Sequence, residues 1–147
     1  MPRGPEAVVF DTSVYVEALR RGLGSGAADA LAKAAGRTYL VSVVWAELRS
    51  GARDEDGRAA LAQLGGPFAA LGRVLCPRHD DWVRAGEGLA DLAIANPGLR
   101  DKTRLLWNDA LILLSAQQID AHVVTANFDD FRLLQRYLGG RVAALEA

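Results

Sequence analysis

The chain has 147 residues, of which 50% are hydrophobic and 24% are charged, and this is the composition of an ordinary globular domain. Its 17 basic and 18 acidic residues leave a formal net charge of −1, which excludes binding to nucleic acid through an overall positive charge but not through a local basic patch. The single cysteine, Cys76, excludes an internal disulfide framework and a cysteine-rich zinc site, and a buried position is expected for it.

Short apolar runs typical of strands alternate with longer segments typical of helices along the chain. The expected strands, in order, are Ala7–Phe10, Thr38–Val41, Val74–Leu75, His122–Thr125 and Arg141–Leu145. The expected helices are Val14–Arg20, Ala27–Ala35, Val43–Ala52 with Ser42 as N-cap, Glu55–Leu71, His79–Ala95, Leu105–Ile119 and Asp129–Leu138.

No internal repeat or linker interrupts this order, so residues 1–147 are expected to form one domain. No stretch approaches the ~20 apolar residues of a membrane span. The N-terminus also lacks the pattern of a signal peptide, so a cytoplasmic protein without membrane contact is expected.

Strands that alternate with helices predict an α/β fold, in which helices cover both faces of a parallel sheet. Functional sites in such sheets form beyond the carboxyl ends of the strands. Asp11 directly follows the first expected strand, and residues 125–130 follow the fourth. Both segments therefore belong to the edge of the sheet where a site is expected, although Asp11 could instead cap the helix that follows it.

Two further acids, Glu47 and Asp109, lack the basic neighbours that surface acids usually have three or four positions away on a helix. Their neighbours at this spacing are apolar or small, and a buried unpaired charge costs several kcal/mol. Asp109 could instead bond to a distant arginine or to a helix N-terminus. Asp130 also lacks a basic neighbour at this spacing, whereas Asp129 has Arg132 at a distance that allows a surface pair.

Carboxylates that converge from separate segments repel each other, and a divalent cation would offset this repulsion. Because the set contains no histidine or cysteine, its oxygen donors favour Mg²⁺ or Mn²⁺ over zinc. Such an ion generates a hydroxide nucleophile for phosphodiester hydrolysis. The acids alone therefore indicate a metal-dependent phosphodiesterase.

Four segments resemble those of the PIN domain, and more closely those of the VapC-type toxins of bacterial and archaeal toxin–antitoxin pairs: VVFDTSVYVEAL, VSVVWAELRSGA, LLWNDALILLSAQQ and HVVTANFDDF. The resemblance implies a three-layer α/β/α fold with a parallel sheet of four to five strands. It also implies Mg²⁺- or Mn²⁺-dependent endoribonuclease activity, a small antitoxin partner and a homodimer. In this resemblance Asp11, Glu47 and Asp109 match the metal-binding acids.

The sequence departs from the pattern at Asn127, where many members carry a fourth acid. Asn127 is expected to act in catalysis by holding a water molecule on the ion, and Asp130 is expected to complete the metal site, with Asp129 a weaker candidate. Three hydroxyl residues are expected to hydrogen-bond to the acids or to water on the ion, namely Thr12, Ser13 and Thr125.

Three basic residues are candidates for contact with RNA phosphates or with the antitoxin, the alternative being solvated surface: Arg49, Arg53 and Arg104. Arg100 and Lys102 cluster with Arg104 just before Asp109, and the same two alternatives apply to them. Trp45, Trp82 and Trp107 are expected in the core or in an interface. A phosphatase of the haloacid-dehalogenase type is disfavoured because Ser13 stands where its second aspartate is required. A PIN-like module that binds RNA or protein with weak or no catalysis stays open, because Asn127 favours it.

Overall fold

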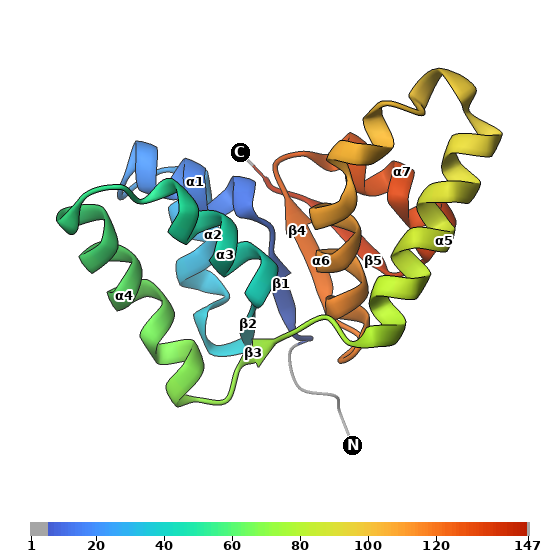
Figure 1. Ribbon diagram of the computed structural model, residues 1–147. Helices are drawn as coiled ribbons and strands as arrows, with labels where there is room; N and C mark the ends of the chain where they lie inside the picture. The colour runs from blue at the N-terminus through green and yellow to red at the C-terminus, as the bar shows by residue number, and fades with distance from the viewer. Residues whose placement is uncertain (1–5, 147) are drawn as a thin grey trace.

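The computed structural model describes residues 6–146 as five strands, seven α-helices and three short 3₁₀ helices (Figure 1). The strands are β1 Val8–Phe10, β2 Thr38–Val41, β3 Val74–Leu75, β4 His122–Thr125 and β5 Arg141–Ala144. The α-helices are α1 Thr12–Arg21, α2 Gly26–Lys33, α3 Ser42–Gly51, α4 Glu55–Ala70, α5 His79–Ala95, α6 Trp107–Gln117 and α7 Phe128–Leu138. The 3₁₀ helices are η1 Ala35–Arg37, η2 Pro97–Leu99 and η3 Lys102–Leu105.

The five strands form one sheet in the order β3-β2-β1-β4-β5, and every neighbouring pair is parallel. In the middle strand, Val8 lies opposite Thr38 of β2 and His122 of β4. All carboxyl ends therefore point to the same edge of the sheet. The predicted parallel sheet of four to five strands is confirmed, with five.

Helices cover both faces of the sheet, as the alternating pattern predicts. Figure 1 shows α1 to α4 gathered on one side of the strands and α5 to α7 on the other. The core is densest around β1, whose three residues are all buried, and around α6, which is buried without interruption over residues 110–116. A helix that is apolar all round is stable only inside the molecule. Because α6 is held in the core in this way, its first turn has a fixed place relative to the sheet.

Several helices begin at other residues than expected: α1 begins at Thr12 rather than Val14, and α2, α3 and α7 each begin one residue early. Helix α6 begins at Trp107 rather than Leu105, because the preceding residues form η3 and Leu105 is 81% exposed. Helix α3 begins at Ser42, so Val41 takes the N-cap position and Ser42 caps nothing. The Ser42 hydroxyl instead lies 3.0 Å from the sulfur of Cys76, which is exposed and not buried as expected.

The tryptophans differ in their surroundings. Trp45 is partly buried and packs against the core, and Gly65 of α4 makes room for its ring, since a β-carbon at Gly65 would lie 2.5 Å from the ring atoms. Trp82 and Trp107 lie outside the core, with ring centres 6.3 Å apart. No helix within residues 6–146 combines the length and the apolar character needed to cross a membrane.

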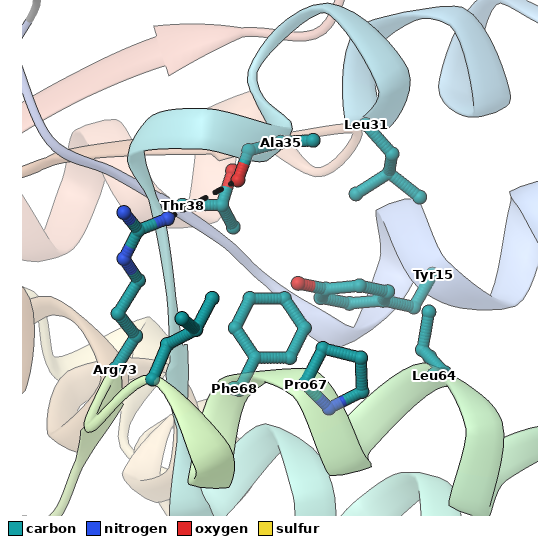
Figure 2. A pocket seen from close by; sticks show the side chains of 9 residues that line it. Tyr15, Leu31, Ala35, Thr38, Leu64, Pro67, Phe68 and Arg73 are labelled. Carbon is teal, nitrogen blue, oxygen red and sulfur yellow. Dashed lines mark hydrogen bonds between the residues drawn. The ribbon is translucent and has the colours of Figure 1, made fainter.

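A hollow of about 230 Å³ lies between α1, α2 and α4, and Figure 2 shows its lining. The lining is mostly apolar and includes Leu31, Leu64 and Phe68. The hydroxyl of Tyr15 points into this hollow, is buried, and has no hydrogen-bond partner among the described residues. None of the acids singled out from the sequence lines the hollow, so it is separate from the candidate active site.

Candidate active site

Asp11 is held at the carboxyl end of β1, with only 3% of its surface exposed. Its backbone N–H donates to the carbonyl of Val124 in β4 (3.2 Å). One carboxylate oxygen accepts from the Ser13 hydroxyl (2.6 Å) and the other from the Thr125 hydroxyl (3.0 Å). The residue also occupies the N-cap position of α1, and although its side chain makes no regular capping bond, the backbone N–H groups of Val14 and Ser13 act on its carboxylate and lower the pKa that burial raises.

Glu47 reaches the same edge of the sheet because α3 follows β2 without a loop. The side chain is half-buried, and its carboxylate accepts a hydrogen bond of 2.8 Å from the hydroxyl of Thr12. Thr12 is the first residue of α1, so this bond joins the elements that follow the two neighbouring strands β1 and β2. The geometry therefore places Glu47 beside the start of α1.

Asp109 lies in the first turn of α6 and is half-buried. Burial, followed by the negative charges of Asp11, Glu47 and Asp130, raises the pKa of the Asp109 carboxyl to about 7. No lysine, arginine or histidine within residues 6–146 forms an ion pair with it. Of the two alternatives, no described arginine pairs with Asp109, whereas its place in the first turn of α6 does put it at a helix N-terminus. Asp109 also lies within electrostatic range of the other three acids.

Thr125 and Asn127 connect β4 to α7 beside this set. The Thr125 hydroxyl, which donates to Asp11, also accepts from the backbone N–H of Asn127 (2.8 Å). Asn127 itself is exposed at the N-cap position of α7, and its amide N–H donates to Asp130 (2.8 Å). The structure therefore places the Asn127 side chain against Asp130, whereas its backbone is tied to the Asp11 network.

Asp130 has a positively charged partner. Its other carboxylate oxygen lies 2.7 Å from the ammonium nitrogen of Lys102 in η3. Burial alone would raise the pKa of Asp130, but the hydrogen bonds from Lys102 and Asn127 prevail and lower it. Asp129 is exposed and forms no ion pair within the described residues; the expected pair with Arg132 is missing, because the Arg132 guanidinium lies over the Phe128 ring at 5.6 Å.

Burial also raises the pKa of Asp11, and the hydrogen bonds from Ser13 and Thr125 oppose this increase. Neutral hydrogen-bond donors thus stabilise Asp11 and Glu47: hydroxyls for both acids and, for Asp11, the backbone N–H groups of Val14 and Ser13 as well. Neither acid forms an ion pair within residues 6–146. A hydroxyl donates one hydrogen bond but carries no charge. The negative charge of Asp11, Glu47 and Asp109 is therefore not neutralised by the described side chains.

The donor set suits a hard divalent cation in its chemistry, because it consists of carboxylate oxygens with uncompensated charge. Within residues 6–146, however, no three His, Cys, Asp or Glu side chains are arranged so that they could hold a metal ion. The acids lie at one edge of the sheet and influence the pKa of Asp109, but their side chains are not arranged as a set of metal ligands.

The three arginines singled out from the sequence are all exposed and form no ion pair with another described residue: Arg49, Arg53 and Arg104. Their contact with RNA or antitoxin stays a prediction. The sequence grouped Lys102 with Arg100 and Arg104 as a basic cluster before Asp109, with contact to RNA phosphates or to the antitoxin as its functional interpretation. It did not predict the bond from Lys102 to Asp130, because the two residues are far apart in the chain.

Comparisons with known proteins agree with this architecture. A family model described as the PIN domain matches residues 8–136. The chain is similar in structure to VapBC from Salmonella typhimurium bound to DNA, with 22% identity, a TM-score of 0.69 and coverage of 97% of this chain and 100% of that one.

It is also similar to FitAB bound to an IR36 DNA fragment, with 18% identity, a TM-score of 0.67 and coverage of 93% of this chain and 94% of that one. For FitAcB from Neisseria gonorrhoeae the identity is 21%, the TM-score is 0.66 and the coverage is 95% of this chain and 96% of that one. At these identities the likeness concerns the fold. No curated protein matches the chain.

Proposed function

Since the chain belongs to the PIN domain family, we propose that it is a metal-dependent endoribonuclease and the toxin of a VapC-type toxin–antitoxin pair. One observation carries this proposal: Asp11, Glu47 and Asp109 come from three separate elements, and Asp109 responds electrostatically to the other two. A fold gains nothing in stability from gathering uncompensated carboxylates, so a functional reason for their placement is favoured.

We propose that the cofactor is Mg²⁺ or Mn²⁺ and that Asp11, Glu47 and Asp109 hold it, directly or through water. When bound, the ion would activate water as the nucleophile and offset the negative charge of the phosphate. The matching family resemblance implies a product with a 5′-phosphate. Asp130 as a further ligand and Asn127 as a catalytic residue stay predictions.

The hydroxyl residues would prepare this site before any ion or substrate arrives. Ser13 and Thr125 each use one lone pair on a different oxygen of Asp11, which fixes the plane of the carboxylate and leaves other lone pairs free. Thr12 does the same for one oxygen of Glu47. Hydrogen bonds of this kind orient ligands, and their loss typically weakens metal binding by about 10- to 100-fold.

The proposed partners are RNA and a small antitoxin, the proposed assembly is a homodimer, and the proposed location is the cytoplasm. The similar solved structures support the antitoxin, because they are VapBC and FitAB assemblies. These assemblies are bound to DNA, which we assign to the assemblies and not to this chain.

The test is cleavage of RNA by the purified protein in Mn²⁺, compared with the Asp109→Asn variant and with Asp129→Asn as a matched control. We expect the wild type and the Asp129→Asn protein to cleave RNA, and the Asp109→Asn protein to lose at least about 100-fold in rate, as removal of a group that acts on the transition state does. Full cleavage by Asp109→Asn, with full toxicity on induction in a bacterial host, would show that the assignment is wrong.

A second candidate function is a PIN-like module that binds RNA or protein without cleaving RNA. Asn127 favours it, because an amide there supplies less negative charge than the acid of many family members. Calorimetric titration with Mn²⁺ separates the two candidates. The ribonuclease is expected to bind the ion and to lose this binding in Asp11→Ala, whereas absence of binding in the wild type would favour the module.

A further inference from the structure

Lys102 is the cationic side chain that enters the acidic site. Its ammonium nitrogen lies 2.7 Å from a carboxylate oxygen of Asp130, and no other lysine or arginine of residues 6–146 forms an ion pair with any of the four acids. Its side chain is 44% exposed, so the ammonium contacts Asp130 and also faces the solvent. Lys102 belongs to η3, and α6 with Asp109 in its first turn begins shortly after it.

The partner of Lys102 is itself held in place. Asp130 accepts the Lys102 ammonium on one oxygen and the Asn127 amide (2.8 Å) on the other. Asp130 also contributes to the electrostatic environment of Asp109. The Lys102 ammonium is therefore held at the rim of the acidic set by the carboxylate of Asp130, which the Asn127 side chain also contacts.

We propose that Lys102 is a substrate-positioning residue that binds a phosphate of the RNA next to the cleaved bond, and that Asp130 and Asn127 hold its ammonium in position. The inference rests on the proposed ribonuclease function. An ammonium group has three N–H donors, and its bond to Asp130 leaves others for phosphate oxygens. The acids repel a polyanionic substrate, so a fixed positive charge at their rim would direct the phosphate towards them.

This inference also gives a physical reason for Asn127. An aspartate at position 127 would lie against Asp130 as a like charge and would have no N–H to donate. The Asn127 amide instead donates to one carboxylate oxygen of Asp130, and the other carboxylate oxygen of Asp130 contacts Lys102. Asn127, which departs from the family pattern, thus allows Asp130 to hold Lys102. This role of Asp130 differs from the metal binding that the sequence predicted for it.

The experiment measures the affinity of a fluorescent single-stranded RNA by anisotropy in EDTA, where a metal-dependent nuclease does not cleave, over a range of salt concentrations. We expect Lys102→Met to weaken binding about five- to tenfold, as loss of a charge-assisted hydrogen bond does. The slope of log Kd against log salt should decrease by about 0.7, the value for one phosphate contact on a single strand. Lys102→Arg should restore most of the affinity.

The chain offers a matched control, since Lys33 is its only other lysine. Lys33 is exposed in the last turn of α2, which leads through η1 to the amino end of β2, at the opposite edge of the sheet. Lys33→Met loses the same charge and should bind RNA like the wild type. Equal RNA affinity and equal salt slopes for Lys102→Met and Lys33→Met would overturn the inference.

Kinetics in Mn²⁺ separate positioning from metal binding. Lys102→Met should raise KM more than it lowers kcat, and Asn127→Asp should also weaken RNA binding. If Asn127→Asp instead increased cleavage at limiting Mn²⁺ and left RNA affinity unchanged, position 127 would serve the ion and the inference would be wrong. A wild type that bound RNA through Lys102 but never cleaved it would contradict the proposed ribonuclease, while still supporting the phosphate contact.

Discussion

Removal of the charge on Asp109 is expected to stabilise the metal-free protein, and to do so more at high pH than at low pH. Folding raises the pKa of this carboxyl from its ordinary value of 3.8 to about 7, through burial first and then through the charges of Asp11, Glu47 and Asp130. The native state therefore binds more protons than the unfolded state between these two values. Stability must decrease as pH rises through this range, which is the reverse of the behaviour of a salt-bridged aspartate.

The size of the effect follows from the pKa difference. A shift of this size corresponds to about 4 kcal/mol of unfolding free energy once the pH exceeds the folded pKa. Somewhat less than half of this cost is present at pH 5, because the carboxyl of the unfolded chain is already ionised there. Asp109 is partly exposed, which reduces the charge effect. We therefore expect about 2 kcal/mol of change between pH 5 and pH 8.

The assay is urea unfolding in EDTA at pH 5, 6, 7 and 8 for the wild type, Asp109→Asn and Asp129→Asn. The free energy gained by Asp109→Asn over the wild type should grow by about 2 kcal/mol across this range. The control Asp129→Asn removes an exposed acid near the same site and should show a constant, small difference. A gain from Asp109→Asn that stayed constant or fell with pH would refute the reasoning, because the acid would then not be destabilised by its surroundings.

Two further pairs of substitutions test the packing of the core away from the site. Tyr15→Phe should raise stability by about 1 kcal/mol, because it removes a buried hydroxyl without a partner, whereas Tyr137→Phe should lower it by about 1 kcal/mol, since that hydroxyl accepts a bond of 3.0 Å. Gly65→Ala should destabilise by about 1 to 3 kcal/mol through collision with the Trp45 ring, whereas Gly66→Ala, with open space around it, should stabilise by about 0.5 to 1 kcal/mol. Thermal or urea unfolding of the four variants measures both pairs, and equal signs within either pair would contradict the packing described.

Local patterns predicted the fold because they are strong here. Strand β1 is a short apolar run that ends in an acid, and every strand lies where such a run was recognised. The start of α6 was misplaced for a tertiary reason: Leu105 continues the apolar periodicity but is 81% exposed, since η3 directs the chain outward before the helix begins. Ser42 was misassigned because its hydroxyl approaches Cys76, a contact between residues far apart in sequence.

The acids of the site could be located in the sequence for a physical reason, whereas the pairing of Lys102 with Asp130 could not. Asp109 interrupts an apolar helix face, and a misplaced carboxylate is costly enough that its presence is informative. Lys102, in contrast, is an ordinary residue in a basic surface segment, where most lysines are solvated. Only the folded structure shows that its side chain reaches Asp130.

The four acids differ in what balances their charge, and this difference indicates where a cation would act. Asp130 has Lys102, Asp11 has two hydroxyls and Glu47 has one, whereas Asp109 is shifted furthest towards its protonated form. A divalent ion at Asp109 would replace that proton and be attracted by the neighbouring acids as well, so protons and the ion compete for the same carboxyl. Metal affinity should therefore fall as the pH drops below about 7, the same pKa that governs the stability of the metal-free protein. The pH dependence of metal affinity and that of the stability of the metal-free protein should therefore share one midpoint. Different pH midpoints would mean that Asp109 is not the acid that receives the ion.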